Sequence, residues 1–501
     1  MTFRKLEERS LRLADGLARL GIGPGDKVAV WLPNLFAPVE IGFALARLGA
    51  ISVAINLGFR AHEVGDILHR SGARALVYAS SIEGTDFSSI LANVDPEHTS
   101  ALEVLVTCGD GEPQTEGPGK VPYEELLDSE TIAEDLSSPD SPCNAFTSSG
   151  TTSVPKLVLH SQRGIASHAR AVADAFSYKE PDCVVLGTLP FCGVFGFNSA
   201  MGTLAAGRPY VLMPVFDAEE AIRLIETHDV THLNGSDEML RRILSAAGSR
   251  PERISSLKEA GFASFDAGGE ELVERGDSAG KRFYQCYGST EVQALLAHQP
   301  PEAHASQRAL AGGLPSSLET KVRVRDRETG ELLTTGEAGE LEVCGPSVMV
   351  GYMGDLEAEK ESLTDDGYLR TGDLGSLTKY GFVFLGRIGD TLRLGGFLVS
   401  PREIEAYLED LPGVAEAQVV GVSTKRGTKA VGFVVEEEGH ELAEEEILER
   451  CKNDLAKVKV PRRVVALPSF PKTESANGVK ISRDKLMNMA SEMLETKQAR
   501  G

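Results

Sequence analysis

Helix-like and strand-like segments alternate over the first hundred residues of this 501-residue chain. Leu6, Leu13, Leu17 and Leu20 share one helical face, and the apolar run 28–32 has the length of a buried strand. A second helix-like segment at 38–48 leads into a second strand-like run at 51–55. Strands and helices in this order usually form a parallel sheet that the helices cover. The sequence therefore predicts an α/β fold.

Changes of pattern further along the chain predict its domains. A passage at 108–142 is rich in glycine, proline, serine and acidic residues, which indicates a loop before a second alternating region. Short strand-like runs with glycine turns then replace the helices, which predicts a small antiparallel barrel. We expect a large N-terminal domain over 1–389, with α/β subdomains at about 1–142 and 143–309 and a β-barrel at about 310–385, and a smaller α+β C-terminal domain over 390–501.

The charge balance and the cysteines limit what the chain can bind. It carries 51 basic and 74 acidic residues, and the net charge of −23 argues against a nucleic acid or an anionic membrane as the main partner. The seven cysteines form no C-x-x-C pair, so we expect reduced thiols and no zinc site. No apolar run reaches the roughly eighteen residues of a membrane span, and no signal-like core opens the chain. We therefore expect a cytoplasmic protein without a membrane span.

The string at 146–156, F-T-S-S-G-T-T-S-V-P-K, packs hydroxyls, a glycine and a lysine closely together. It offers backbone N–H groups, side-chain hydroxyls and one cation to a triphosphate. It is not a Walker loop, because no G-K-[ST] follows a glycine at the required spacing. By itself the string fits a phosphate-binding loop and a Ser/Thr-rich surface turn equally well.

Four further strings carry groups that suit a nucleotide. In 284–291 an aromatic ring, a hydroxyl and a carboxylate follow a strand-like run, as expected for contacts with a base, a phosphate and a divalent cation. The string 367–373 ends in Asp373, which can accept two hydrogen bonds from a ribose diol. G-R-I-G-D follows at 386–390, and 471–481 holds a lysine after a turn. Each string alone is also compatible with an ordinary turn or strand end.

The order and spacing of all five strings resemble the adenylate-forming superfamily of acyl- and aryl-CoA synthetases, nonribosomal peptide adenylation domains and luciferases. The resemblance covers nearly the whole chain and includes the runs G-D-K-V-A-V-W-L-P-N and G-R-I-G-D-T-L-R-L-G-G-F-L-V-S-P-R-E-I-E. It implies an AMP-forming ligase that makes carbon–sulfur bonds. ATP and Mg²⁺ would activate a small-molecule carboxylic acid to an acyl-adenylate, and CoA would then displace AMP.

The resemblance also implies residue roles. Catalysis would depend on Lys480, Thr290 and Glu291, with Glu291 as the Mg²⁺ ligand. The nucleotide would contact Ser148, Ser149, Gly150, Thr151, Thr152, Lys156, Gly268, Gly269, Tyr287, Gly288, Asp373 and Arg387. The acid would lie against Cys192, Val194, Phe195, Phe197, Ala267 and Val292. Asp390 would be the hinge of a mobile C-terminal domain, and CoA would meet Gly395 and Gly396.

Several positions depart from the family pattern. Ser153 and Leu157 stand where the phosphate loop of the family has glycines, which permit close approach of the backbone to phosphate. The turn before Lys480 is longer than usual, with Val479 inserted after the glycine. Cys192 stands at or next to a usual histidine, and a small buried thiol is the simpler explanation for it.

The identity of the acid and of the acceptor stays partly open. No Asp or Glu occurs from Pro190 to Phe216, so the ammonium of an amino acid would lack a partner there, and Asp266 is the alternative partner. An aryl or medium-length apolar acid fits better. One alternative is a stand-alone enzyme that loads the phosphopantetheine of an acyl carrier protein. Another is a non-catalytic relative that binds a nucleotide or an acyl ligand.

Overall fold

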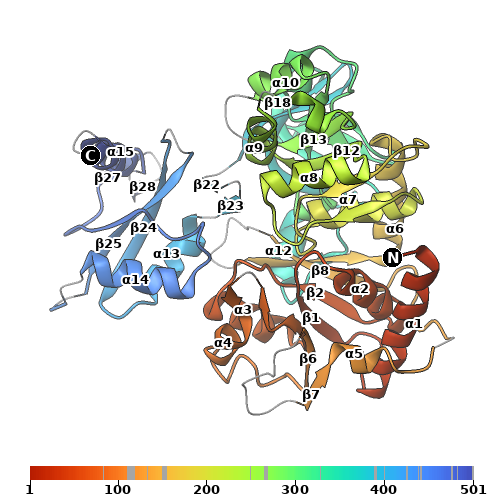
Figure 1. Cartoon of the computed structure of the whole chain (residues 1–501). Helices are drawn as coiled ribbons and strands as arrows, with labels where there is room; N and C mark the ends of the chain where they lie inside the picture. The colour runs from red at the N-terminus through yellow and green to blue at the C-terminus, as the bar shows by residue number, and fades with distance from the viewer. Residues whose placement is uncertain are drawn as a thin grey trace. The chain divides into compact units, whose positions relative to one another are not determined.

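The computed structural model of the chain describes every residue except 83, 110–118, 132–133, 149–154, 249, 265–268, 328, 389–391, 396, 400, 425–426, 438, 441–442, 476–477, 482 and 499–501. It forms two compact units, whose elements are labelled in Figure 1. The larger unit contains Met1–Leu57, Val64–Ser148 and Leu157–Ile388, and the main segment of the smaller unit is Gly389–Gly501.

The first sheet of the larger unit has eight strands, mostly parallel. Their order is β19 (Gly351–Tyr352), β9 (Lys156–Ser161), β8 (Pro142–Ser148), β2 (Ile51–Ala54), β1 (Lys27–Trp31), β3 (Ala75–Ala79), β6 (Val104–Cys108) and β7 (Gly119–Pro122). The helix α1 (Phe3–Arg19) precedes β1, and the chain from β1 to β8 also forms the helices α2 (Phe36–Leu48), α3 (Ala61–Ser71), α4 (Phe87–Ala92) and α5 (Tyr123–Leu126) and the small hairpin β4 (Ser81–Ile82) and β5 (Thr85–Asp86). The alternation expected for the first hundred residues is present.

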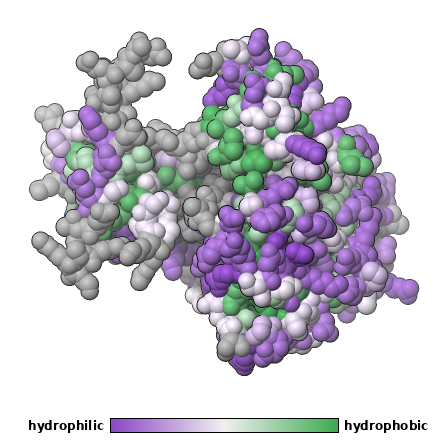
Figure 2. Space-filling model, turned by 90° about the horizontal axis from the view of Figure 1, so that it is seen from above, coloured by the Kyte–Doolittle hydropathy of each residue, from purple (hydrophilic) through white to green (hydrophobic). Residues whose placement is uncertain are grey.

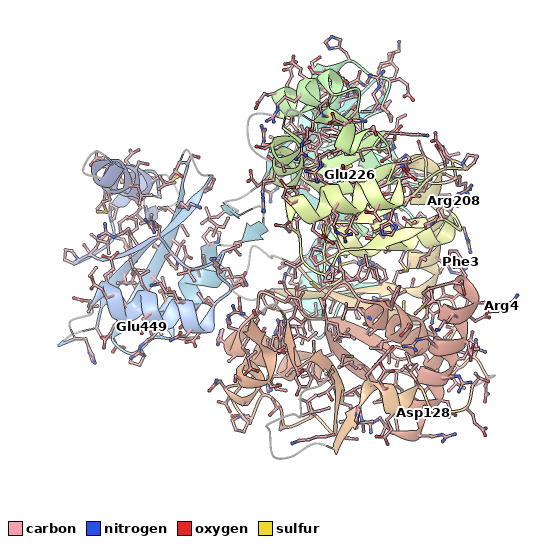
Figure 3. All side chains as sticks on the ribbon, in the orientation of Figure 1. Phe3, Arg4, Asp128, Arg208, Glu226 and Glu449 are labelled. Atoms are coloured by element: carbon pink, nitrogen blue, oxygen red, sulfur yellow. The ribbon has the colours of Figure 1, made fainter. Side chains whose placement is uncertain are left out.

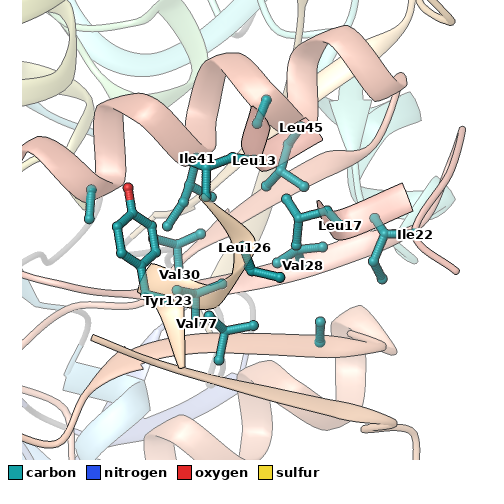
Figure 4. Packing of buried hydrophobic residues seen from close by; sticks show 14 of the residues in the cluster. Leu13, Leu17, Ile22, Val28, Val30, Ile41, Leu45, Val77, Tyr123 and Leu126 are labelled. Atoms are coloured by element: carbon teal, nitrogen blue, oxygen red, sulfur yellow. The ribbon is translucent and has the colours of Figure 1, made fainter. Parts of the chain in front are cut away.

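The core of this layer is built from the apolar faces that the sequence pattern indicated. Leu13 and Leu17 of α1 and Ile41 of α2 pack with Val28 and other strand residues in one buried cluster (Figure 4). At roughly 25 cal/mol per Å² of buried apolar surface, such packing is the main force that fixes the helices on the sheet.

The second sheet has eleven strands and changes direction along its order. The strands are β11 (Tyr210–Leu212), β10 (Val185–Gly187), β12 (His232–Ser236), β13 (Glu259–Ala263), β14 (Arg282–Tyr287), β15 (Ala297–His298), β16 (Gly312–Pro315), β21 (Gly381–Arg387), β20 (Leu369–Thr378), β18 (Ala338–Cys344) and β17 (Lys321–Arg325). Pairing is parallel from β11 to β14 and antiparallel beyond it. The antiparallel strands expected over 310–385 thus continue the second sheet.

The helices of this half are α6 (Gln162–Ala175), α7 (Val194–Ala205), α8 (Ala218–His228), α9 (Asp237–Ala247), α10 (Gly269–Ser278), α11 (Ala305–Arg308) and α12 (Leu356–Ser362), with short 3₁₀ turns η1 (Pro251–Ile254) and η2 (Thr290–Val292). Side-chain caps explain several of their starts. Ser161, Asp217 and Ser236 each accept a hydrogen bond from a backbone N–H of the first turn.

The smaller unit has its own sheet, of β24 (Val414–Val422), β25 (Lys429–Glu436) and β26 (Arg463–Ala466). Its other elements are the hairpin β22 (Leu392–Leu394) and β23 (Phe397–Val399), the helices α13 (Pro401–Glu409), α14 (Glu444–Asp454) and α15 (Arg483–Gln498), and the hairpin β27 (Lys472–Ser475) and β28 (Gly478–Ile481). Apolar residues on the sheet belong to two separate buried clusters, represented by Val419 and by Phe433.

Hydrophilic residues cover most of the larger unit on the face shown in Figure 2, where hydrophobic residues form separate patches. None of the helices in the described part of the chain has the length and hydropathy needed to cross a membrane.

Candidate active site

Tyr287, at the end of β14, is buried and lies in contact with another predicted site residue. Its hydroxyl donates a hydrogen bond to Oδ2 of Asp373 in β20, at 2.7 Å. The rings of Phe382 and Phe384 have centroids 5.1 and 5.7 Å from that of Tyr287 and restrict its orientation. The side chain expected beside adenine therefore touches the one expected beside ribose, although 86 positions separate them.

The turn after Tyr287 has an unusual backbone. Gln293, Ala294 and Leu295 have positive φ values of 65°, 48° and 39°. Such conformations cost on the order of 1–3 kcal/mol each in residues other than glycine and persist where their surroundings impose them. At Gly288 an added Cβ would lie 2.5 Å from Cα of Ala294. The turn therefore requires glycine at 288 and leaves no room for a looser path.

Thr290 and Glu291, in η2, are each held by a neutral side chain. Nε2 of His160 lies 2.9 Å from the Thr290 carbonyl oxygen, which can only accept, so His160 donates there. Burial lowers the pKa of His160 to about 4, so its ring is neutral near pH 7. The Tyr352 hydroxyl donates to Oε1 of Glu291 at 3.2 Å. Neither partner brings a positive charge that would compete with a cation for the Glu291 carboxylate.

The predicted phosphate loop connects two neighbouring strands of the first sheet. Ser148 is the last residue of β8 and Lys156 the first of β9, whereas Ser149, Gly150, Thr151 and Thr152 lie outside the described residues. The Ser148 hydroxyl is buried and has no hydrogen-bond partner within the part of the chain that the structure describes. β8 also contacts η2, so the first strand of the loop runs beside the Thr290–Glu291 turn. A buried hydroxyl of this kind is available for a ligand oxygen.

The remaining nucleotide residues are only partly described. Asp373 and Arg387 are register partners in the β20–β21 pair, but the side chain of Arg387 lies outside the described residues. Gly269 begins α10, where an added Cβ would lie 3.2 Å from the carbonyl oxygen of Ala309. Gly268 lies outside the described residues.

An apolar cavity of about 440 Å³ lies in the larger unit. Side chains from β1, β2, β8 and the helices α1, α2, α6 and α7 line it, among them Phe146, Cys192 and Phe197. The rings of Phe146 and Phe197 are 5.2 Å apart, and Phe146 lies 6.2 Å from the ring of His160. The cavity wall thus connects through Phe146 and His160 to the Thr290 turn.

The outer part of the cavity reaches solvent. Phe3, at the start of α1 (Figure 3), and Phe43 of α2 line it and are 50% and 43% exposed. Arg170 is the charged residue among its described lining residues, and no acidic side chain is among them. The cavity therefore suits an apolar ligand and offers nothing to pair with an ammonium group.

The six residues expected around the acid do not all lie at this cavity. Cys192 and Phe197 line it, and Val194 belongs to the same buried cluster as Cys192. Phe195 packs partly against that cluster, whereas Val292 is buried in a separate core. Burial raises the pKa of the Cys192 thiol to about 11, so it stays protonated near pH 7 and packs as a small apolar group. Ala267 lies outside the described residues.

The predicted catalytic lysine, the predicted hinge and the glycines predicted to meet CoA belong to the smaller unit. Lys480 is in β28, opposite Thr473 of β27, and its side chain lies outside the described residues. Gly395 forms the β22–β23 turn with a positive φ of 58°. The predicted hinge Asp390 and the second CoA glycine, Gly396, lie outside the described residues.

The sequence matches the family model of the AMP-binding enzyme over residues 1–353 and that of the AMP-binding enzyme C-terminal domain over residues 403–477. The chain belongs to the AMP-binding enzyme family. The adenylate-forming superfamily and the α/β fold class predicted from the sequence are confirmed.

Relatives of this AMP-binding enzyme include ligases that use CoA. It is 31% identical to the 3-[(3aS,4S,7aS)-7a-methyl-1,5-dioxo-octahydro-1H-inden-4-yl]propanoyl:CoA ligase of Rhodococcus jostii (strain RHA1), over 96% of this chain and 92% of that protein. It is 30% identical to the 2-methylpropanoate–CoA ligase CCL4 of Humulus lupulus, over 98% and 91% of the two chains. The structure of a double mutant of o-succinylbenzoate CoA synthetase (MenE) from Bacillus subtilis with a product analogue matches with a TM-score of 0.81, 26% identity and coverage of 97% and 94%.

Sequence reasoning missed three contacts of this AMP-binding enzyme. His160 follows the phosphate string by four positions, but nothing in its local pattern marks a hydrogen bond to residue 290. Tyr352, which donates a hydrogen bond to Glu291, lies in a short edge strand. Phe382, whose ring packs against Tyr287, has no local feature that distinguishes it from the other aromatic residues. These contacts join segments far apart in the chain, so no local periodicity could have indicated them.

Proposed function

We propose that this protein is an ATP-dependent acid–CoA ligase for an apolar carboxylic acid. The carboxylate attacks the α-phosphorus of ATP, pyrophosphate leaves, and the CoA thiol then displaces AMP from the acyl-adenylate. The CoA ligases among the relatives support both half-reactions. The single observation that supports the site most is the Tyr287–Asp373 hydrogen bond, because it joins two strings that were assigned to the same nucleoside.

The nucleotide would lie between the phosphate loop and the Tyr287 turn. Tyr287 and Gly288, with Gly268 and Gly269, would contact adenine, and Asp373 with Arg387 would hold the ribose. Ser148 to Thr152 and Lys156 would hold the phosphates. The unpartnered Ser148 hydroxyl supports this role, since a phosphate oxygen would satisfy it.

Mg²⁺ would be held by Glu291. Among the described residues no group of three or more His, Cys, Asp and Glu side chains could hold a metal. A site with one carboxylate and substrate phosphates is the arrangement that Mg²⁺ commonly takes. The half-buried Glu291 carboxylate, with a tyrosine hydroxyl as neighbour, fits this arrangement. The ion would neutralise charge on the phosphates.

Catalysis of adenylation would depend on Thr290 and Lys480. Two anions, the carboxylate and the α-phosphate, repel each other as they approach. A lysine ammonium between them reduces that repulsion and stabilises the charge that develops on phosphorus. Lys480 is the lysine that the family resemblance assigns to this role, and Thr290 would contact the α-phosphate from η2.

The acid would place its apolar body in the 440 Å³ cavity, against Cys192 and Phe197. Its volume suits a medium-length chain or a ring-bearing acid, and its lining gives no partner to a charged amino group. Val194, Phe195, Ala267 and Val292 would act as supporting residues.

Thioester formation would use the smaller unit after rotation about Asp390. Gly395 and Gly396 would allow the pantetheine arm to pass close to the backbone. CoA rather than a carrier protein is proposed as the acceptor, in agreement with the ligases among the relatives.

The proposal is tested by pyrophosphate release from a panel of apolar acids with and without CoA, followed by mass analysis of the products. We expect acyl-AMP without CoA and acyl-CoA with it. Acyl-AMP that persists with CoA but is consumed when a phosphopantetheinylated carrier protein is added would contradict the choice of acceptor. No pyrophosphate release with any acid would contradict the activity itself.

A further inference from the structure

Two buried side chains hold the backbone of the 290–295 turn from outside it. Nε2 of His160, in β9, donates a hydrogen bond to the Thr290 carbonyl oxygen at 2.9 Å. Nδ2 of Asn198, in α7, donates to the Gln293 carbonyl oxygen at 2.8 Å. Both side chains are fully buried, so water does not compete for these bonds. The turn is therefore fixed both to a strand of the first sheet and to the helix α7.

The turn needs such support because its backbone is strained. Gln293 has a positive φ of 65°, and the next two residues also have positive values. Residues other than glycine keep this conformation only where their surroundings impose it. Asn198 holds the carbonyl group of Gln293 itself. Loss of that bond should let the turn relax, and Thr290 and Glu291 should shift with it.

Stability alone does not explain an asparagine at 198 and a histidine at 160. Oδ1 of Asn198 and Nδ1 of His160 are buried and have no hydrogen-bond partner within the described part of the chain. A polar atom without a partner in a protein interior costs free energy of folding. An apolar side chain of similar size would avoid this cost at both positions but could not donate to the turn. Conflicts of this kind between polarity and burial are expected at functional sites.

Both side chains are also connected to the wall of the apolar cavity. Phe197, which lines the cavity, directly precedes Asn198 in α7. The ring of Phe197 lies 5.2 Å from that of Phe146, which in turn lies 6.2 Å from the ring of His160. The cavity wall is therefore connected to the turn by two routes. One runs along α7 to Asn198, and the other passes through Phe146 to His160.

We propose that Asn198 and His160 are positioning residues for adenylation, which fix the turn that carries Thr290 and Glu291 relative to the wall of the acid cavity. The inference rests on the proposed ligase function and adds to it the residues that align the two substrates. An acid whose tail lies against Phe197 is then held at a set distance from the nucleotide. Adenylation requires a carboxylate oxygen close to the α-phosphorus, and a misplacement of about 1 Å can lower the rate about 100-fold.

The test compares the full-length variants Asn198→Leu and His160→Met, which remove the donors, with His160→Gln, whose side-chain N–H group can replace Nε2. The maximal rate of ATP–pyrophosphate exchange should fall about 10- to 100-fold in the first two variants, while the KM values for ATP and the acid change less than about threefold. His160→Gln should recover most of the rate. Thr203→Val is the matched control and should keep the wild-type rate, because the buried Thr203 hydroxyl donates to Ser199 of its own helix.

Amide hydrogen exchange measures the support of the turn without the reaction. The backbone N–H groups of Gln293 and Ala294 donate to the carbonyl oxygens of Thr290 and Ser289. Exchange of the 290–295 segment, followed by mass spectrometry, should therefore be slow in the wild type and in His160→Gln. It should be about tenfold faster in Asn198→Leu and His160→Met.

Several results would overturn the inference. Wild-type rates of pyrophosphate exchange in both donor-free variants would do so, as would an equal fall in Thr203→Val. A rise confined to the KM for ATP, or unchanged hydrogen exchange of the turn, would also overturn it, and an active wild type in these cases leaves the ligase function intact. Wild-type protein that exchanges no pyrophosphate with any acid, but whose turn loosens in Asn198→Leu and His160→Met, would contradict the ligase function and retain the support of the turn by these side chains.

Discussion

The apolar cavity of the larger unit and an open groove of the smaller unit, formed by the start of β25, the helix α14 and the segment 455–463, differ in the charge of their lining. Phe146, Phe197 and other apolar side chains dominate the cavity. The groove adds charge to an otherwise partly apolar lining: the cations Lys429, Lys452, Lys457, Arg462 and Arg463 outnumber the carboxylates Glu444 and Glu445. Burial of apolar surface is non-directional and nearly independent of salt, whereas attraction of phosphate depends on charge and is screened by salt.

With the proposed function, this difference implies that the two organic substrates would be recognised by separate physical means. The acid would be selected by shape and apolar area in the cavity, and CoA would be selected by charge. The residues predicted for the nucleotide at Tyr287, Asp373 and the Thr290–Glu291 turn line neither the cavity nor the groove. Changes in each region should therefore affect different kinetic constants.

The largest effect should come from Lys480→Ala, which removes the proposed catalytic charge and changes neither the cavity nor the groove. Adenylation should fall by roughly two or more orders of magnitude, as the loss of a charge contact in the transition state can produce. ATP–pyrophosphate exchange measures this step directly. Lys472→Ala, in the same hairpin, is the control. Normal exchange in Lys480→Ala with loss in Lys472→Ala would show that the catalytic lysine is misassigned.

Tyr287→Phe should raise the KM for ATP about tenfold, since it leaves the buried Asp373 carboxylate without its tyrosine hydrogen bond, at a cost of roughly 1–3 kcal/mol. The KM values for the acid and for CoA should change little. The three KM values from steady-state assays check this. A selective rise in the KM for the acid would place Tyr287 at the acid site instead.

Acid pH should destabilise the larger unit through its buried histidines. Burial lowers the pKa of His160, His168 and His232 to about 4, below the value of about 6.5 expected in the unfolded chain. The unfolded state therefore binds more protons, and stability falls as the pH drops from about 6.5 towards 4. His160→Gln should reduce the slope of the free energy of unfolding against pH by about 1.4 kcal/mol per pH unit. Urea unfolding at pH 7, 6 and 5 measures this slope. Equal slopes in the wild type and in His160→Gln would show that the pKa of His160 is not lowered.

A homologous series of straight-chain acids tests the apolar cavity. Each added methylene should raise kcat/KM about fourfold until the cavity is filled, because burying a CH₂ contributes about 0.8 kcal/mol. Met201→Trp, which adds bulk to the lining, should shift the best acid towards shorter chains. Leu244→Trp, in a different core, serves as the control for overpacking. A preference that stays unchanged in Met201→Trp would exclude this cavity as the acid site.

The smallest effect should come from salt, which should change the KM for CoA and not the KM for the acid. Raising NaCl from about 0.05 to 0.5 M shortens the screening length, so the KM for CoA should rise a few-fold while the KM for an uncharged-tail acid stays nearly constant. The salt dependence for CoA should weaken in Lys457→Gln/Arg462→Gln. Equal salt effects on the KM for CoA and on the KM for the acid would contradict the distinction between the groove and the cavity.

Local patterns predicted much of the framework. The run expected at 28–32 appears as the strand Lys27–Trp31, and the helix expected at 38–48 appears within the helix Phe36–Leu48. Both depend on periodicity within a few residues, which the sequence displays directly. The glycine in the 284–291 string is likewise explained locally, by the close approach of Ala294.

Contacts across the chain could not be read from the sequence. The Tyr287–Asp373 hydrogen bond and the support of Thr290 by His160 depend on which strands become neighbours. The barrel expected over 310–385 continues the second sheet because β16 pairs with β15 and β21. The apolar cavity likewise collects residues from seven strands and helices, each of which looked like ordinary core.

The central claim is that the carboxylate oxygen of an acid attacks the α-phosphorus of ATP. Turnover with an acid labelled with ¹⁸O in both carboxylate positions, in the presence of ATP and CoA, tests it most directly. The account predicts AMP that carries one ¹⁸O atom and acyl-CoA that carries the other. Unlabelled AMP, or label in phosphate with ADP as the second product, would contradict it.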